Sequence, residues 1–395
     1  MDIGHNKPSL FRNQVLALRQ KPNPRRLDIF ALNEHEEWWI QHFDYLKEHG
    51  YLLRPRYRPG WKPSYNTKGI EGRAAEDGQV LFRYSIMDAL RISDSLVIAM
   101  KRVKDETSEA QIATFFSDDA HNSDPRNHCV RILDIFPVPG LPEKIIVMAW
   151  MRKVMNPRFR TVGEGIQFLN EMVEGLQYMH QNNVAHSSFR TRDCAINNMA
   201  MEADAMYTRP YHPVRPKKRY DRSGPALHHS RTRRPPRYYL IDFGYSQKYD
   251  PSQPRPLEYA IKSGGFTPPE GLKGIPCDPF STDIFILGSP IHASFLDGNP
   301  NPHMHDPGMS DFEFLRPLVE DMVVDDPAKR PTMDEVASRF SEIIQKVPWW
   351  KLRARAAKKD EFPLIKPFRA FYHVFWTASM MLLLKPAIPS PKPIH

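Results

Sequence analysis

The hydrophobic pattern of this chain changes its period near residue 160, and this change limits the folds that the chain can adopt. Residues 80–104 alternate between apolar and polar side chains as strands do, and two apolar runs at 129–136 and 144–151 also favour strands. Over 163–181 the apolar residues instead recur at the spacing of a long buried helix. A strand-rich front followed by a helix-rich rear indicates an α+β protein built of two lobes.

Further helices are predicted from the same periodicity. We expect them over 32–49, 108–117, 283–288, 311–323 and 332–344. Residues 51–66 are rich in proline and aromatic side chains, so we expect an extended segment there.

These patterns divide the sequence into four segments. An N-terminal arm and helix (1–49) precede a strand-rich lobe (50–150) and a helical lobe (151–348). The tail at 349–395 is basic and then apolar. A basic stretch at about 203–237 is expected to be a surface insertion between two strands of the helical lobe.

The formal net charge of +9 comes largely from residues 209–237. A basic loop is usually solvated, so nucleic-acid binding is not favoured, although such a loop could also dock acidic partners. Cys129, Cys194 and Cys277 offer neither a disulfide framework nor the spacing of a zinc site, which favours a reducing, cytoplasmic location.

The apolar part of the tail contains no Lys, Arg, Asp or Glu between residues 370 and 384. Fifteen residues are too few to span a bilayer comfortably. We expect a helix that packs on the helical lobe through its aromatic face. The alternative is an interfacial helix that makes peripheral contact with a membrane.

The first chemical signal is the triplet Asp242-Phe243-Gly244, which follows the apolar run 238–241. Phosphoryl transfer depends on charge neutralisation and positioning, so it needs a carboxylate that holds magnesium against phosphate groups. An aspartate at the end of a strand, followed by a flexible glycine, supplies such a carboxylate. The triplet alone is a weak signal because short motifs recur by chance.

Four more residues stand at a spacing that suits the same chemistry. Asp193 and Asn198 lie five residues apart. The catalytic loops of phosphoryl-transfer enzymes place a base and a second metal ligand at the same separation. Lys101 ends an apolar strand, where an ammonium can bind the α- and β-phosphates, and Glu109 opens the next helix and can pair with it. Taken singly, each has an ordinary explanation as a surface or turn residue, so the order and spacing carry the argument.

Pro268-Pro269-Glu270, Asp283 and Arg330-Pro331 follow in the same order as in a known family. Together with the residues above, over about 51–344, they resemble the protein kinase superfamily, and in detail the kinase-like domain proteins of mushroom-forming fungi. The resemblance implies a two-lobed protein kinase fold with a strand-rich N-lobe and a helical C-lobe. It also implies that Glu270 pairs with Arg330 and that Asp283 holds the backbone of the catalytic loop.

The implied activity is transfer of the ATP γ-phosphate to a serine or threonine hydroxyl of a protein, with magnesium. By this resemblance, Lys101 and Glu109 would position ATP and Asp193 would act as the base. Asn198 and Asp242 would hold magnesium, with Phe243 and Gly244 completing the nucleotide-binding triplet, Asp242-Phe243-Gly244.

The glycine-rich loop of the family is not recognisable here. Gly50, Gly60, Gly69, Gly72 and Gly78 precede Lys101, but they form no G-x-G-x-x-G pattern. Main-chain N–H groups could still cover the phosphates, with a weaker affinity for the nucleotide.

The catalytic loop allows two registers. In the preferred one, residues 187–191 are an insertion that separates His186 from Arg192-Asp193, and Asp193 keeps the role of base. In the ungapped register, Ser188 takes the base position and Asp193 takes the position of the asparagine.

The ungapped register describes a pseudokinase, a non-catalytic interaction or scaffold protein, and this remains the main alternative. A kinase that phosphorylates a small molecule is a third hypothesis. The segment at 268–270 and its partners favour the protein kinases over this third class.

Overall fold

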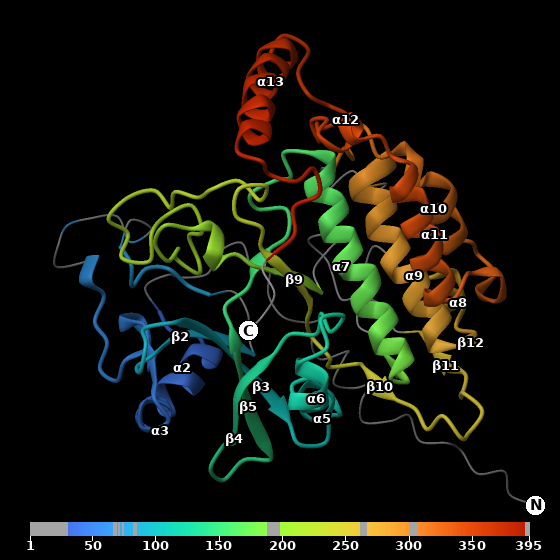
Figure 1. The fold of residues 1–395 in the computed structure, drawn as a ribbon. Helices are drawn as coiled ribbons and strands as arrows, with labels where there is room; N and C mark the ends of the chain where they lie inside the picture. The colour runs from blue at the N-terminus through green and yellow to red at the C-terminus, as the bar shows by residue number, and fades with distance from the viewer. Residues whose placement is uncertain are drawn as a thin grey trace, which may run out of the picture.

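The computed structural model describes residues 31–65, 69, 72, 75–81, 85–187, 198–260, 267–299 and 306–391. Figure 1 shows a sheet built from the first part of these residues beside a group of helices built from the later part. The order of strands first and helices later confirms the predicted α+β class.

Five antiparallel strands form the N-terminal sheet, in the order β1-β2-β3-β5-β4. Their bounds are β1 Tyr51–Leu53, β2 Ile86–Arg91, β3 Val97–Lys104, β4 Ile132–Pro137 and β5 Glu143–Ala149. The strands predicted within 80–104, 129–136 and 144–151 are therefore confirmed. Because side chains alternate along a strand, Ile98 and Met100 of β3 are buried in one core cluster, and Lys101 points to the opposite face.

Two short helices cover the buried face of the sheet, where one helix was predicted over 32–49. They are α2 (Glu34–Gln41) and α3 (Phe43–Glu48), and His42 interrupts the helical conformation between them. Asn33 begins α2 with a capping box, and its side chain accepts hydrogen bonds from two backbone N–H groups. The apolar periodicity continues across the break because Trp39 and Leu46 both pack in the same cluster.

The later part of the chain is built around α7 (Val162–Gln181). Thr161 caps this helix, since its hydroxyl accepts a hydrogen bond from the Glu164 N–H at 3.1 Å. Three further helices are α9 (Pro279–Ile291), α10 (Arg316–Met322) and α11 (Met333–Lys346). α11 packs on α7 and α10 packs on α9. The helices predicted over 163–181, 283–288, 311–323 and 332–344 are thus confirmed, with shifted ends.

The remaining elements are short, except for the 17-residue helix α13. The other helices are α5 Glu109–Phe115, α6 Asp119–Asn122, α8 Pro269–Lys273, α12 Trp349–Leu352, α13 Lys366–Leu382, the π-helix η6 His292–Asp297 and the 3-10 turns η3 Pro55–Tyr57, η5 Asp204–Met206, η7 Glu313–Leu315 and η8 Pro327–Lys329. The other strands form the sheets β6-β8-β9 (Arg152–Lys153, Met199–Glu202, Arg237–Leu240), β10-β7 (Gln247–Lys248, Val184–Ala185) and β11-β12 (Glu258–Tyr259, Pro276–Cys277).

The stretch between β8 and β9, here called the insertion (203–236), lies between two strands as predicted and exposes most of its lysines and arginines, but part of it packs into the fold. Tyr211, His212 and Arg231 within it are all buried. The guanidinium of Arg231 donates to the backbone carbonyls of Val154 and Pro157. A basic composition predicts an exposed loop, but an arginine can be buried when its guanidinium donates to carbonyls and stacks on aromatic rings, as Arg231 does on Phe159.

The tail also differs from the prediction of a helix packed on the helical part. Figure 1 shows α13 standing away from the other helices, and most of its aromatic side chains are exposed. Periodicity identified the helix and its apolar face, but it cannot tell whether a partner covers that face. Among the described residues, the structure contains no helix long and apolar enough to cross a membrane.

Candidate functional site

Lys101 lies between two carboxylates that come from distant parts of the sequence. Its Nζ is 2.6 Å from Oδ1 of Asp242, and it also forms an ion pair with Glu109 at the start of α5. The predicted contact between Lys101 and Glu109 is therefore present. Sequence reasoning did not place Asp242 in direct contact with the same ammonium.

The electrostatics of this trio favour a charged lysine. Burial alone would lower the pKa of Lys101, but Asp242 and Glu109 outweigh burial and raise this pKa. Burial raises the pKa of Glu109, and Lys101 opposes that rise. The ammonium therefore stays protonated at neutral pH and is aimed at the solvent-accessible carboxylate of Asp242.

The backbone at Asp242 turns its carboxylate towards Lys101. Asp242 has φ of 68°, in the left-handed region that aspartate tolerates better than most residues. Phe243 is buried, and its ring centroid lies 5.6 Å from that of His186. A Cβ on Gly244 would lie 3.2 Å from Oε2 of Glu109, so the chain passes very close to the trio there.

Asn198 lies at the same end of the β8–β9 hairpin as Asp242. The strand register pairs Met199 with Leu240, and the Ile241 N–H donates to the Asn198 carbonyl at 2.8 Å. A carboxylate and an amide oxygen are hard ligands of the kind that magnesium prefers. The donor set of Asn198 and Asp242 therefore fits magnesium.

Asp193, the predicted base, lies outside the described residues, together with the rest of 188–197. The two registers of the catalytic loop therefore stay predictions. The structure does describe His186 and Ser187, which precede this segment. Buried Asp283 accepts hydrogen bonds from the backbone N–H groups of His186 at 2.7 Å and Ser187 at 2.8 Å. The contact implied for Asp283 is confirmed at these two residues.

A cavity of about 440 Å³ lies between the sheet and the β8–β9 hairpin. Ile86 and Ala99 line it from the sheet, Met199 and Ile241 line it from the hairpin, and residues 148–151 join the two sides. Its lining is mostly apolar, as is common for small-molecule sites. The charged trio adjoins it, because Ile86 pairs with Lys101 across β2 and β3 and Ile241 precedes Asp242.

The insertion supplies one wall of this cavity, which sequence reasoning missed. Its residues in the lining are Tyr211, Pro213, Val214 and Pro216. The signal that could have revealed this wall is the set of prolines and tyrosines among the basic residues.

Polar contacts fix that wall to the N-terminal part of the chain. Arg215 Nε donates to Oε1 of Gln79 at 2.6 Å, and His212 Nε2 lies 3.5 Å from a carboxylate oxygen of Glu76. Arg152 also donates to the Pro216 carbonyl at 2.9 Å. The cavity is therefore bounded by three separate parts of the sequence.

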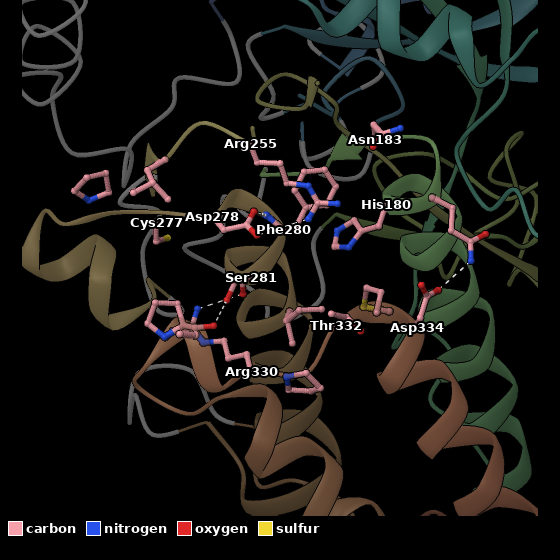
Figure 2. A pocket seen from close by; sticks show the side chains of 18 residues that line it. His180, Asn183, Arg255, Cys277, Asp278, Phe280, Ser281, Arg330, Thr332 and Asp334 are labelled. Carbon is pink, nitrogen blue, oxygen red and sulfur yellow. Dashed lines mark hydrogen bonds and ion pairs between the residues drawn. The ribbon is translucent and has the colours of Figure 1, made fainter. Parts of the chain in front are cut away.

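A second cavity, of about 760 Å³, lies where the end of α7 meets the starts of α9 and α11. Figure 2 shows that its charged side chains lie against neighbours from these same elements. Arg255 lies 3.9 Å above the Phe280 ring, and Asp334 accepts hydrogen bonds from two glutamines of α7. Because these polar groups pair with neighbouring side chains, we interpret their role as structural. The first cavity is therefore the better candidate site.

Arg330, at the edge of the second cavity, forms a buried two-point ion pair with Glu270. The two nitrogen–oxygen distances are 2.7 and 2.8 Å. Burial alone would raise the pKa of Glu270, but Arg330 outweighs it and lowers this pKa. The pairing implied by the sequence resemblance is confirmed, and it fixes α8 to the turn before α11.

No protein-family model matches the chain, and no curated protein matches it. Its function is therefore inferred from the residues and the geometry described above.

Proposed function

We propose that this chain is a protein kinase with a two-lobed kinase fold, which binds ATP with magnesium and transfers the γ-phosphate to a serine or threonine hydroxyl of a protein. The observation that supports this most is the Lys101 ammonium, placed between Glu109 and Asp242 beside an apolar cavity. Phosphoryl transfer uses a fixed lysine on the phosphates and a carboxylate that holds magnesium beside the nucleotide, and this arrangement can supply both.

The cavity suits the base of a nucleotide, and the trio suits its phosphates. A volume of about 440 Å³ falls in the range of small-molecule sites, and apolar walls from Ala99 and Met199 can stack against a flat ring. Lys101 would bind phosphate oxygens, because its ammonium is charged and held in place by Glu109.

Asp242 and Asn198 would hold magnesium, which neutralises phosphate charge when bound. In the structure the Asp242 carboxylate contacts Lys101, so both groups are already directed towards one point. Asp193 would orient the substrate hydroxyl and accept its proton. Asp283 acts as a positioning residue for the segment that carries Asp193, through its bonds to His186 and Ser187.

A non-catalytic kinase-like protein is the second candidate, and one observation favours it. Tyr211 and the neighbouring prolines of the insertion occupy one wall of the cavity, where a nucleotide site needs open access. In this alternative the cavity serves stability, and the surfaces of the protein bind its partners.

The first experiment tests whether the cavity and the charged trio form a nucleotide-binding site. We expect ATP with magnesium to stabilise the wild-type chain by about 2.7 kcal/mol at a hundredfold excess over Kd. This stabilisation should raise its melting temperature. Lys101→Met should lose this shift. Lys104→Met is the matched control, because Lys104 lies on the same strand with an exposed side chain. The absence of any shift at saturating ATP would refute the nucleotide site.

Phosphate transfer separates the two candidates. We expect Asp242→Asn to abolish autophosphorylation, measured by mass spectrometry, because an amide cannot supply the charge that holds magnesium. Asp250→Asn is the control, since Asp250 is exposed and bonds only locally to Ser252. Autophosphorylation that survives in Asp242→Asn would contradict the assignment, and binding without transfer in wild type would favour the non-catalytic protein.

A further inference from the structure

The helix α13 exposes its apolar face to solvent. A narrower strip of its surface, called its edge, contacts the rest of the protein. The residues of that edge are His373, Trp376 and Met380. His373 Nε2 lies 2.9 Å from the carbonyl oxygen of Arg353, and the Arg160 guanidinium lies 4.8 Å from the Trp376 ring centre. The helix is therefore held firmly but covered on one side only, as its position in Figure 1 also shows.

The uncovered face carries large apolar side chains at helical spacing. They are Phe368, Phe371, Tyr372, Phe375 and Leu382, with exposed fractions between 61% and 85%. Globular proteins usually bury such a row, and a contiguous exposed one marks an interaction surface. The orientation is the reverse of what packing on the protein core would produce.

Exposed apolar residues also flank α13 on both sides. Trp349, Trp350, Phe362, Leu364 and Leu384 are each at least 60% exposed. Tryptophan and other aromatic side chains are enriched where membrane proteins cross the boundary between water and lipid.

The same part of the chain is strongly basic. Residues 349–391 contain eight lysines and arginines against two acidic residues, a formal charge of +6. One of the two acids, Glu361, already pairs with Arg355 and Arg369. Lys359 also pairs with Glu313 and Asp297 outside the tail, so the surface combines large apolar groups with a positive charge that is balanced only in part.

We propose that α13 binds the surface of an anionic lipid bilayer and lies in the plane of its interface. An apolar face flanked by lysines and arginines is the pattern of interfacial helices. A second copy of this chain fits less well, because it would bring two tails of the same charge together. Anionic lipid headgroups instead supply the opposite charge.

The test uses the full chain and two kinds of vesicle, phosphatidylcholine alone and phosphatidylcholine with phosphatidylserine. We expect sedimentation with the anionic vesicles, weakened by added salt because salt screens surface charges. Phe371→Ser with Phe375→Ser should lower the vesicle affinity about tenfold or more, since both rings are exposed and would enter the interface. The melting temperature should not change.

Leu227→Ser with Leu272→Ser is the matched control, because these leucines are 58% and 65% exposed and belong to the insertion and to α8 and not to the tail. This control should bind anionic vesicles as the wild type does. Equal binding to neutral and anionic vesicles, or no binding to either, would overturn the proposal. It would also be overturned if the wild type formed a dimer that the phenylalanine substitutions dissociate without any effect on vesicles.

Discussion

Replacing Lys101 with methionine removes the cation that two carboxylates share. Methionine keeps much of the length and volume of the side chain, so the change is mainly electrostatic. The side chains of Lys101 and Glu109 are only 13% and 9% exposed, whereas Asp242 is 39% exposed and can be solvated. The loss should therefore come mostly from Glu109, a carboxylate left buried without its partner.

Removing one partner of a buried ion pair costs about 3–5 kcal/mol. We expect about 3 kcal/mol here, because Glu109 can take up a proton and so escape part of the penalty. For a chain of 395 residues, whose unfolding entropy near the melting temperature is about 0.8 kcal/mol/K, that loss lowers the melting temperature by about 4 °C. Chemical denaturation at neutral pH would measure it directly.

The loss should depend on pH with a definite sign. Burial raises the folded-state pKa of Glu109, so this group stabilises the fold at acid pH and loses that contribution as pH rises through its folded pKa. Without Lys101 its pKa rises further. The Lys101→Met variant should therefore be weakest relative to wild type at about pH 8 and recover towards about pH 5.

The double variant Lys101→Met with Glu109→Gln isolates the cause. It should recover much of the stability and lose the pH dependence, because no buried charge remains at either position. If the single variant shows the same deficit at both pH values and Glu109→Gln does not reduce it, the buried pair is not the source of the stability.

Three further outcomes are expected. Arg330→Met should cost about 3–5 kcal/mol in urea unfolding at neutral pH and less in acid, because the lowered pKa of Glu270 makes its ion pair a stabilising term that is lost as pH falls. Gly163→Ala should lower the melting temperature and release the returning tail to limited proteolysis, since its new Cβ would lie 1.9 Å from the Ala387 carbonyl oxygen. Arg215→Ala should speed hydrogen exchange in the cavity wall about fivefold, as expected for the loss of a hydrogen bond worth about 1 kcal/mol.

The sequence predicted the elements of this fold well where a local pattern determines them. The spacing of apolar residues identified α7, and alternation identified β3 with Lys101 near its end. The contact between Lys101 and Glu109 spans eight residues and could be anticipated from a strand followed by a helix. The contact between Lys101 and Asp242 spans 141 residues, so it followed only from the tertiary structure.

The packing of two segments, the insertion and the tail, was not predicted from the sequence, and both cases share one physical reason. Composition shows which side chains a segment contains, whereas the burial of those side chains depends on which other segments pack against them in the fold. The insertion contains many arginines, but Arg231 finds buried carbonyl acceptors that no local pattern reveals. The tail contains many aromatic residues, but in α13 they find no covering surface among the described residues.

The cavity wall formed by the insertion changes how a ligand can enter. Within the insertion, Arg215 donates to Gln79, and Arg231 donates to the carbonyls of Val154 and Pro157. A rotation that widened the cavity would therefore have to break the bond at Gln79. A ligand too large for the present cavity would then enter only when this hydrogen bond opens.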